Sequence, residues 1–184
     1  DADEYNYNIK AVFTDDKLTI YLRDAELYDE LHLPPMVIGA YTEEDGYIYD
    51  FPVDIIVEGD SAITVAGSTR GSNASNAINN LSTGLLTISS VNNAKLTLQS
   101  ISANGDTTTG VTLNSVGSVK LLNTNVELSN VYQTQALYIG NSTTNSNLEV
   151  INSKLDVITN SSGAPNAIRL AGSSGNVTFT NSQV

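Results

Sequence analysis

The chain lacks several residue types on which common functional sites depend. Among its 184 residues there is no cysteine and no tryptophan, and His32 is the only histidine. These absences exclude disulfide scaffolds, thiolate metal sites and cysteine nucleophiles. They also exclude a zinc site built from several histidines. A Ser-His-Asp triad would have to use His32, which precedes two prolines in a turn and is therefore interpreted as structural.

Basic residues and long apolar runs are also scarce. Only 8 Lys+Arg oppose 20 Asp+Glu, which gives a formal net charge of −12. A polyanion of this size is repelled by phosphate backbones and anionic lipid, so a nucleic-acid partner is not expected. No apolar run approaches the roughly 20 residues that span a bilayer as a helix, so direct membrane insertion is not expected either.

The charge and the polar residues are unevenly distributed. Residues 1–60 contain 16 acids and 3 bases, whereas residues 61–184 contain 4 acids and 5 bases. The second part holds 19 Asn, 20 Ser and 16 Thr, a composition that by itself would suggest disorder. Apolar residues nevertheless recur at every second position throughout it, which is typical of β-strands. A repetitive β architecture with polar corners is therefore predicted.

Similar segments recur along the chain at a nearly fixed period. Asn147–Val157 aligns with Asn176–Val184 and with Ser118–Leu128. The first apolar residues of successive copies are 35, 33, 33, 29 and 29 residues apart, and they are Leu18, Val53, Leu86, Val119, Leu148 and Val177. Such a period indicates a solenoid in which each copy forms one turn.

Each copy contains three short apolar segments separated by turn residues. Strands of three to five residues are too short for stable isolated hairpins, but they can pair with the equivalent strand about 4.8 Å above and below. The predicted fold is therefore all-β, a single-stranded right-handed parallel β-helix of about five to six coils, the hand following that of parallel crossovers. We expect one domain over residues 1–184, with an acidic cap and the first coils in 1–60 and regular coils in 61–184.

Alternation within the strands predicts which side chains enter the interior. Thr112 is expected to face outward, as are Lys120 and Glu149, which would form an ion pair between adjacent coils worth less than about 1 kcal/mol. The residues expected inside are Leu86, Ile88, Leu96, Leu98, Val111, Leu113, Val119, Leu121, Val126, Leu128, Leu137, Ile139, Leu148, Val150, Leu155, Val157, Ile168, Leu170, Val177 and Phe179.

Asn123, Asn152 and Asn181 occupy the same position in three copies, directly after one of the strands. Asparagine tolerates the left-handed backbone of a sharp corner, and stacked amides can hydrogen-bond to one another. We interpret these residues as a structural asparagine ladder. Their use as polar ligands for a substrate is the alternative.

The segment 41–51 interrupts the repeat and combines aromatic with acidic side chains. Tyr41, Tyr47 and Tyr49 are the candidate ligand-binding residues, because a tyrosine face suits a sugar ring and its hydroxyl suits sugar hydroxyls. The neighbouring carboxylates could accept sugar hydroxyls or hold Ca²⁺, which takes six to eight oxygen ligands. A solvated acidic loop is the third interpretation. The candidate metal ligands are Glu43, Glu44, Asp45 and Asp50.

Catalysis is not expected from the acids of the regular coils. Glu127 and Asp156 should stack on one outward face, at a spacing that would suit a retaining glycosidase. A flat exposed face provides neither a cleft nor the desolvation that raises the pKa of a catalytic acid. The chain is therefore predicted not to be an enzyme and to have no catalytic residues.

Two segments resemble a known family. Residues 18–27 (LTIYLRDAEL) and 53–65 (VDIIVEGDSAITV) resemble the opening of clostridial-type surface carbohydrate-binding domains with a pectate-lyase-like right-handed parallel β-helix. The resemblance implies a secreted, non-catalytic module that binds polysaccharide or glycan on a bacterial cell surface, within a larger surface protein. Calcium is the one cofactor that it suggests. A structural adhesin stalk or spacer is the main alternative, and a polysaccharide lyase or hydrolase is a third.

Overall fold

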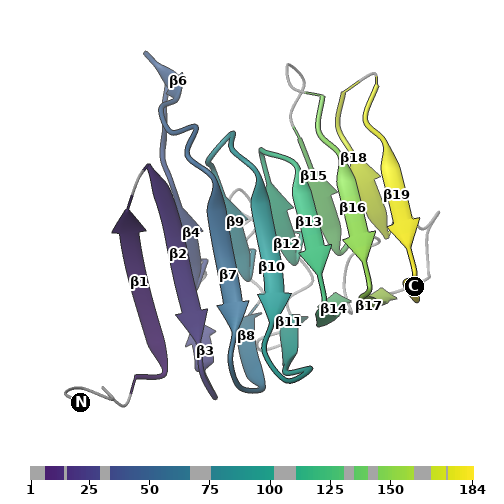
Figure 1. Cartoon of the computed structure of the whole chain (residues 1–184). Coiled ribbons are helices and arrows are strands. Elements are labelled where there is room, and N and C mark those ends of the chain that lie inside the picture. The colour runs from purple at the N-terminus through teal and green to yellow at the C-terminus, as the bar shows by residue number, and fades with distance from the viewer. Residues whose placement is uncertain are drawn as a thin grey trace.

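The structure is a computed structural model that describes residues 7–14, 16–29, 34–66, 76–101, 111–130, 135–140, 145–159, 167–172 and 174–184. Every regular element within these ranges is a β-strand, and the strands form a parallel β-solenoid, which confirms the predicted fold class (Figure 1). These ranges hold no helix that is long and apolar enough to cross a membrane.

Three sheets run along the solenoid, and a separate two-stranded hairpin projects from it (Figure 1). The front sheet contains β1 (Ile9–Thr14), β2 (Lys17–Leu22), β7 (Val53–Val57), β10 (Leu86–Ser90), β13 (Val119–Leu122), β16 (Leu148–Ile151) and β19 (Val177–Thr180). The second sheet contains β3 (Glu26–Asp29), β8 (Ser61–Ala66), β11 (Lys95–Ile101), β14 (Asn125–Asn130) and β17 (Lys154–Thr159). The third sheet contains β4 (Met36–Ile38), β9 (Ile78–Asn80), β12 (Leu113–Ser115), β15 (Leu137–Ile139) and β18 (Ile168–Leu170). The hairpin consists of β5 (Tyr41–Thr42) and β6 (Gly46–Tyr47).

The strands pair in the register that the sequence repeat predicts. Val119 is opposite Leu86 on one side and Leu148 on the other, and all pairings within the three sheets are parallel except β1 with β2. Five strands in each of the second and third sheets correspond to four steps between coils. The solenoid therefore advances by about four turns, slightly fewer than the five to six coils expected.

Alternating aliphatic side chains fill the interior, as predicted. Leu121 is 1% exposed and Val150 is fully buried, and both belong to one continuous apolar cluster that extends along the solenoid. Because each coil places its inward residues over those of the next coil, the interior is a stack of aliphatic layers. Burial of this apolar surface is the main favourable contribution to folding.

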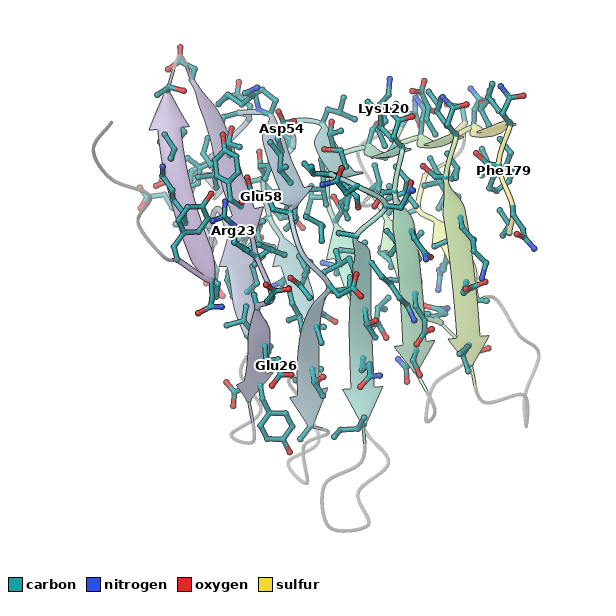
Figure 2. The ribbon with its side chains drawn as sticks, turned by 60° about the horizontal axis from the view of Figure 1, so that its bottom comes forward. Arg23, Glu26, Asp54, Glu58, Lys120 and Phe179 are labelled. Carbon is teal, nitrogen blue, oxygen red and sulfur yellow. The ribbon has the colours of Figure 1, made fainter. Side chains whose placement is uncertain are left out.

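Two predictions of inward side chains were wrong at the last strand. Val177 and Phe179 of β19 are 44% and 46% exposed, although their register with Leu148 and Val150 is the predicted one. Their partners Leu148 and Val150 are buried, so the two side chains lie on the interior face. In the described part of the chain no further strand pairs with β19, and Phe179 lies at the end of the ribbon (Figure 2). Alternation predicts on which face of the sheet a side chain lies, but it does not predict whether another coil covers that face.

Thr112 is a third correction, because it is fully buried and not outward. The sequence predicts a strand over 111–113, whereas β12 begins two residues later, at Leu113. The Thr112 hydroxyl donates to the Ser129 carbonyl oxygen at 3.1 Å and lies 3.2 Å from the Ser100 hydroxyl. These partners replace the hydrogen bonds to water, so burial of the hydroxyl costs little free energy.

The predicted asparagine ladder forms at the corner between the front and second sheets. Asn123, Asn152 and Asn181 have positive φ angles of 50°, 48° and 47°. The Asn152 amide nitrogen donates to the Asn123 amide oxygen at 3.2 Å, and that of Asn181 donates to the Asn152 oxygen at 3.4 Å. Asparagine is one of the few residues other than glycine that adopt this backbone conformation readily.

Ion pairs connect the outer surfaces of adjacent coils. The predicted pair between Lys120 and Glu149 forms, with 3.3 Å between its charged atoms. Near the first coils, the Tyr7 hydroxyl donates to the Glu58 carboxylate at 2.9 Å, and the Arg23 guanidinium donates to the same carboxylate (Figure 2). Lys17 donates to the Asp54 carboxylate at 2.8 Å.

These contacts predict a loss of stability at alkaline pH. The hydrogen bond to Glu58 raises the pKa of Tyr7 above 10.0, and the hydrogen bond to Asp54 raises the pKa of Lys17 above 10.5. A raised folded-state pKa contributes stability that is complete below the unfolded-state pKa and is lost as the pH rises through the folded-state value. The melting temperature should therefore fall above about pH 10 in thermal melts followed by circular dichroism.

Tyr7→Phe should reduce this alkaline decrease, because the ionising hydroxyl is gone. Tyr28→Phe, which removes a hydroxyl on the second sheet outside this cluster, should keep the wild-type profile. Identical pH profiles for Tyr7→Phe and the wild type would contradict the assignment to Tyr7.

Candidate functional site

Within the segment 41–51, residues 41–47 form a β-hairpin that stands out from the start of the front-sheet strands (Figure 1). Tyr41 and Tyr47 are opposite each other across β5 and β6, and their rings make an edge contact with centroids 5.0 Å apart. Tyr41 is 56% exposed, whereas Tyr47 is half-buried beneath it. The predicted insertion is thus an ordered hairpin that holds a tyrosine ring in solvent.

A second group of rings lies at the base of the hairpin. Phe51 contacts Tyr49 with centroids 5.3 Å apart, and it contacts Phe13 of β1 edge-on at 5.2 Å. Phe13 is 57% exposed and Tyr49 is 41% exposed. We call the five rings Phe13, Tyr41, Tyr47, Tyr49 and Phe51 the aromatic surface. It comprises the three predicted binding tyrosines and two phenylalanines in two groups of contacting rings, Tyr41 with Tyr47 and Phe51 with Tyr49 and Phe13.

A groove lies along the corner between the third and front sheets. It encloses about 260 Å³ and is lined by Thr83, Leu85, Ser118, Val119, Asn147 and Glu149. Thr83 connects it to the hairpin, because its backbone N–H and its hydroxyl both donate to the Tyr49 carbonyl oxygen. We call this the edge groove. Its lining combines hydroxyl, amide and carboxylate groups with one exposed leucine.

The predicted metal ligands surround the hairpin turn without forming a cluster. Glu43, Glu44 and Asp50 are exposed, and Asp45 is involved in the turn, where its backbone N–H donates to the Thr42 hydroxyl at 2.9 Å. Across the ranges that the structure describes, no three His, Cys, Asp or Glu side chains are grouped so as to hold a metal ion. Calcium binding therefore stays a prediction without geometric support.

The two acids considered for catalysis are in register on the second sheet, as predicted. Each is engaged by a lysine: Lys95 lies 2.7 Å from the Glu127 carboxylate and Lys154 lies 2.6 Å from the Asp156 carboxylate. Glu127 and Asp156 therefore act as ion-pair partners on an outer face. His32 lies outside the described residues.

Sequence reasoning missed Phe13 and the edge groove. Phe13 is 38 residues from Phe51, and only the pairing of β1 with β2 brings it to the hairpin. The groove residues Leu85, Ser118 and Asn147 each precede a front-sheet strand. This shared position in the repeat is a signal that the period itself could have supplied.

Comparisons with family models, with curated proteins and with solved structures gave no match for this chain. The β-helix part of the sequence resemblance agrees with the fold, whereas the carbohydrate-binding and clostridial parts receive no support from these comparisons.

Proposed function

We propose that the chain is a non-catalytic extracellular module that binds polysaccharide or glycan through the aromatic surface. The observation that carries this proposal is the exposure of Phe13, Tyr41 and Tyr49 on one projecting hairpin and its base. Large exposed aromatic groups that do not pack into the core mark an interaction surface.

A sugar suits this surface better than an apolar peptide does. The C–H face of a pyranose packs on an aromatic ring, and its hydroxyls need hydrogen-bond partners around that ring. The exposed carboxylates of Glu43, Glu44 and Asp50 accept such bonds, and Ser118 and Asn147 of the edge groove offer both donors and acceptors. The acidity of residues 1–60 favours a neutral or basic glycan over an acidic one.

The competing functions use other features. A structural stalk on a secreted bacterial surface protein would need the solenoid alone and would leave the aromatic surface without a role. A lyase or hydrolase would need free acids, whereas Glu127 and Asp156 are each bound to a lysine. The aromatic surface therefore favours binding over both.

Removal of two exposed rings should abolish binding. The double variant Tyr41→Ala/Tyr49→Ala should lose retention on the insoluble polysaccharide that retains the wild type, with at least a tenfold increase in Kd, since aromatic anchors dominate such interfaces. The measurement is a pull-down against a panel of insoluble polysaccharides, followed by a depletion isotherm on the best binder.

Tyr28→Ala is a matched control, because Tyr28 and Tyr41 are both 56% exposed but Tyr28 lies on β3 of the second sheet. It should bind as the wild type does. Retention of the double variant at wild-type strength, or no retention of the wild type on any polysaccharide, would refute the proposal. Release of reducing or unsaturated sugar would instead favour an enzyme.

A further inference from the structure

A larger groove lies at the opposite end of the front-sheet strands, away from the hairpin. It is open to solvent, has a volume of about 510 Å³ and lies at the corner after β13, β16 and β19. These strands turn there toward the second sheet (Figure 1). We call it the amide groove. All of its lining residues are polar, and they are Asn93, Asn123, Thr124, Asn125, Asn152, Ser153, Lys154, Asn181, Ser182 and Gln183.

Successive coils are joined at this corner by backbone hydrogen bonds, such as the one from the Asn123 N–H to the Ile151 carbonyl oxygen. The side chains that add to these bonds are hydroxyls and not amides. The Ser153 hydroxyl accepts from the Thr124 N–H at 3.1 Å, and the Ser182 hydroxyl accepts from the Ser153 N–H at 3.2 Å. Thr124 and Ser153 are 5% and 7% exposed, so this hydroxyl ladder is turned inward. The amide ladder lies outside it, where a hydrogen bond between solvent-exposed side chains adds little net stability.

The amides retain unused hydrogen-bonding capacity. Each ladder contact uses one donor of the upper amide and the oxygen of the lower amide, although a primary amide offers two donors. Among the residues that the structure describes, the Asn125 amide oxygen is shielded from solvent and has no hydrogen-bond partner. A change in the Asn125 rotamer breaks no hydrogen bond at that oxygen, so the side chain can turn toward a ligand that brings a donor.

The longer corner between β10 and β11 forms one end of the groove. Four residues separate these strands, whereas two separate β13 from β14 and β16 from β17. Asn93 belongs to this longer corner and has a φ of 59°. The groove thus runs parallel to the solenoid axis and has amide groups at intervals of one coil, about 4.8 Å.

We propose that the amide groove binds a neutral polyhydroxylated chain, an extended oligosaccharide lying along the solenoid axis. Asn123, Asn152 and Asn181 donate to successive hydroxyls, and Asn125 accepts from one of them. Lys154 is the only charged residue of the lining, and it pairs with Asp156 at 2.6 Å, so the groove has no free cation for an acidic sugar. This site is separate from the aromatic surface and rests on different residues.

The test is a titration with cellohexaose, observed through the side-chain amide signals in ¹H–¹⁵N NMR spectra. The signals of Asn123, Asn125, Asn152 and Asn181 should shift together and saturate. They should do so also in Tyr41→Ala/Tyr49→Ala, which separates this site from the proposed function. An oligogalacturonate of similar length should produce much weaker shifts.

Two variants remove amides with little effect on the fold. Asn123→Gly/Asn152→Gly keeps residues that accept a positive φ, and Asn125→Ala removes an amide oxygen that has no partner among the described residues. Each should raise the Kd for cellohexaose at the groove by about fivefold or more. Asn114→Ala is the matched control, since Asn114 donates to Asn79 at 2.8 Å on the third sheet and does not line the groove.

Three results with the ligands and the groove variants would overturn the proposal, and a fourth comes from the control variant. They are unshifted groove amides at saturating cellohexaose, an unchanged Kd in both groove variants whose circular dichroism matches the wild type, and oligogalacturonate binding at least as tight as that of cellohexaose. An equal loss of affinity in Asn114→Ala would also contradict it, because the effect would then not be specific to the groove.

Discussion

Leu121→Ala should lower the free energy of unfolding by about 2–5 kcal/mol, whereas Phe179→Ala should lower it by only about 1 kcal/mol. Leu121 is 1% exposed in the middle of the aliphatic stack, so its truncation leaves a cavity between two coils. Phe179 is 46% exposed and has coil contacts on one side only. Urea denaturation followed by circular dichroism measures both.

The informative quantity is the difference between the two variants in how much unfolding free energy they lose. The wild-type phenylalanine is the larger side chain, so its truncation would cost more than that of Leu121 if both were buried equally. A larger loss for Phe179→Ala would show that the end of the solenoid is covered in solution. Equal, small losses would show that the interior is not packed as described.

Gly117→Ala should destabilise the protein by at least about 3 kcal/mol. A methyl group at Gly117 would overlap the carbonyl oxygen of Gly84 in the coil below, and one at Gly84 would overlap that of Phe51. These contacts are with backbone, so no flexible side chain can move aside. The backbones of adjacent coils therefore lie so close at Gly84 and Gly117 that only a hydrogen atom fits in place of a side chain.

Gly46→Ala is the control for this effect. Gly46 has a φ of +74° and no neighbour within 4 Å of an added Cβ, so its substitution costs backbone strain alone, about 1–2 kcal/mol. Thermal and urea unfolding of both variants should therefore give a clearly larger loss for Gly117→Ala. A comparable or smaller loss would contradict the close approach of the coils at Gly117.

The repeat predicted most of the fold because its period indicates which strands are neighbours, whereas the alternation of apolar residues indicates which side chains face the interior. Spacings of 29 to 35 residues placed Val119 beside Leu86 and Leu148, and alternation placed Leu121 and Val150 inside. Alternation did not predict that Thr112 is buried, because partners 12 and 17 residues away satisfy its hydroxyl. Such partners depend on how the coils are stacked, which local sequence does not specify.

The candidate sites were less predictable for the same reason. The tyrosines of 41–51 stand close together in the sequence, and their clustering follows from a local hairpin. Phe13 reaches the same surface through the pairing of β1 with β2 and the contact with Phe51. The amide groove depends on both the recurrent asparagine and the unequal corner lengths, and only the three-dimensional arrangement of the coils makes these residues line one groove.

The direction of the interstrand hydrogen bonds has a mechanical consequence. These bonds lie roughly parallel to the axis, so tension between the two ends of the solenoid would load one coil interface after another. Coils contact only their neighbours in such an architecture, so they would peel away singly and not rupture together. Each detached repeat would release 29 to 35 residues, or about 100–120 Å of extended chain, which would make the module a stepwise extensible tether.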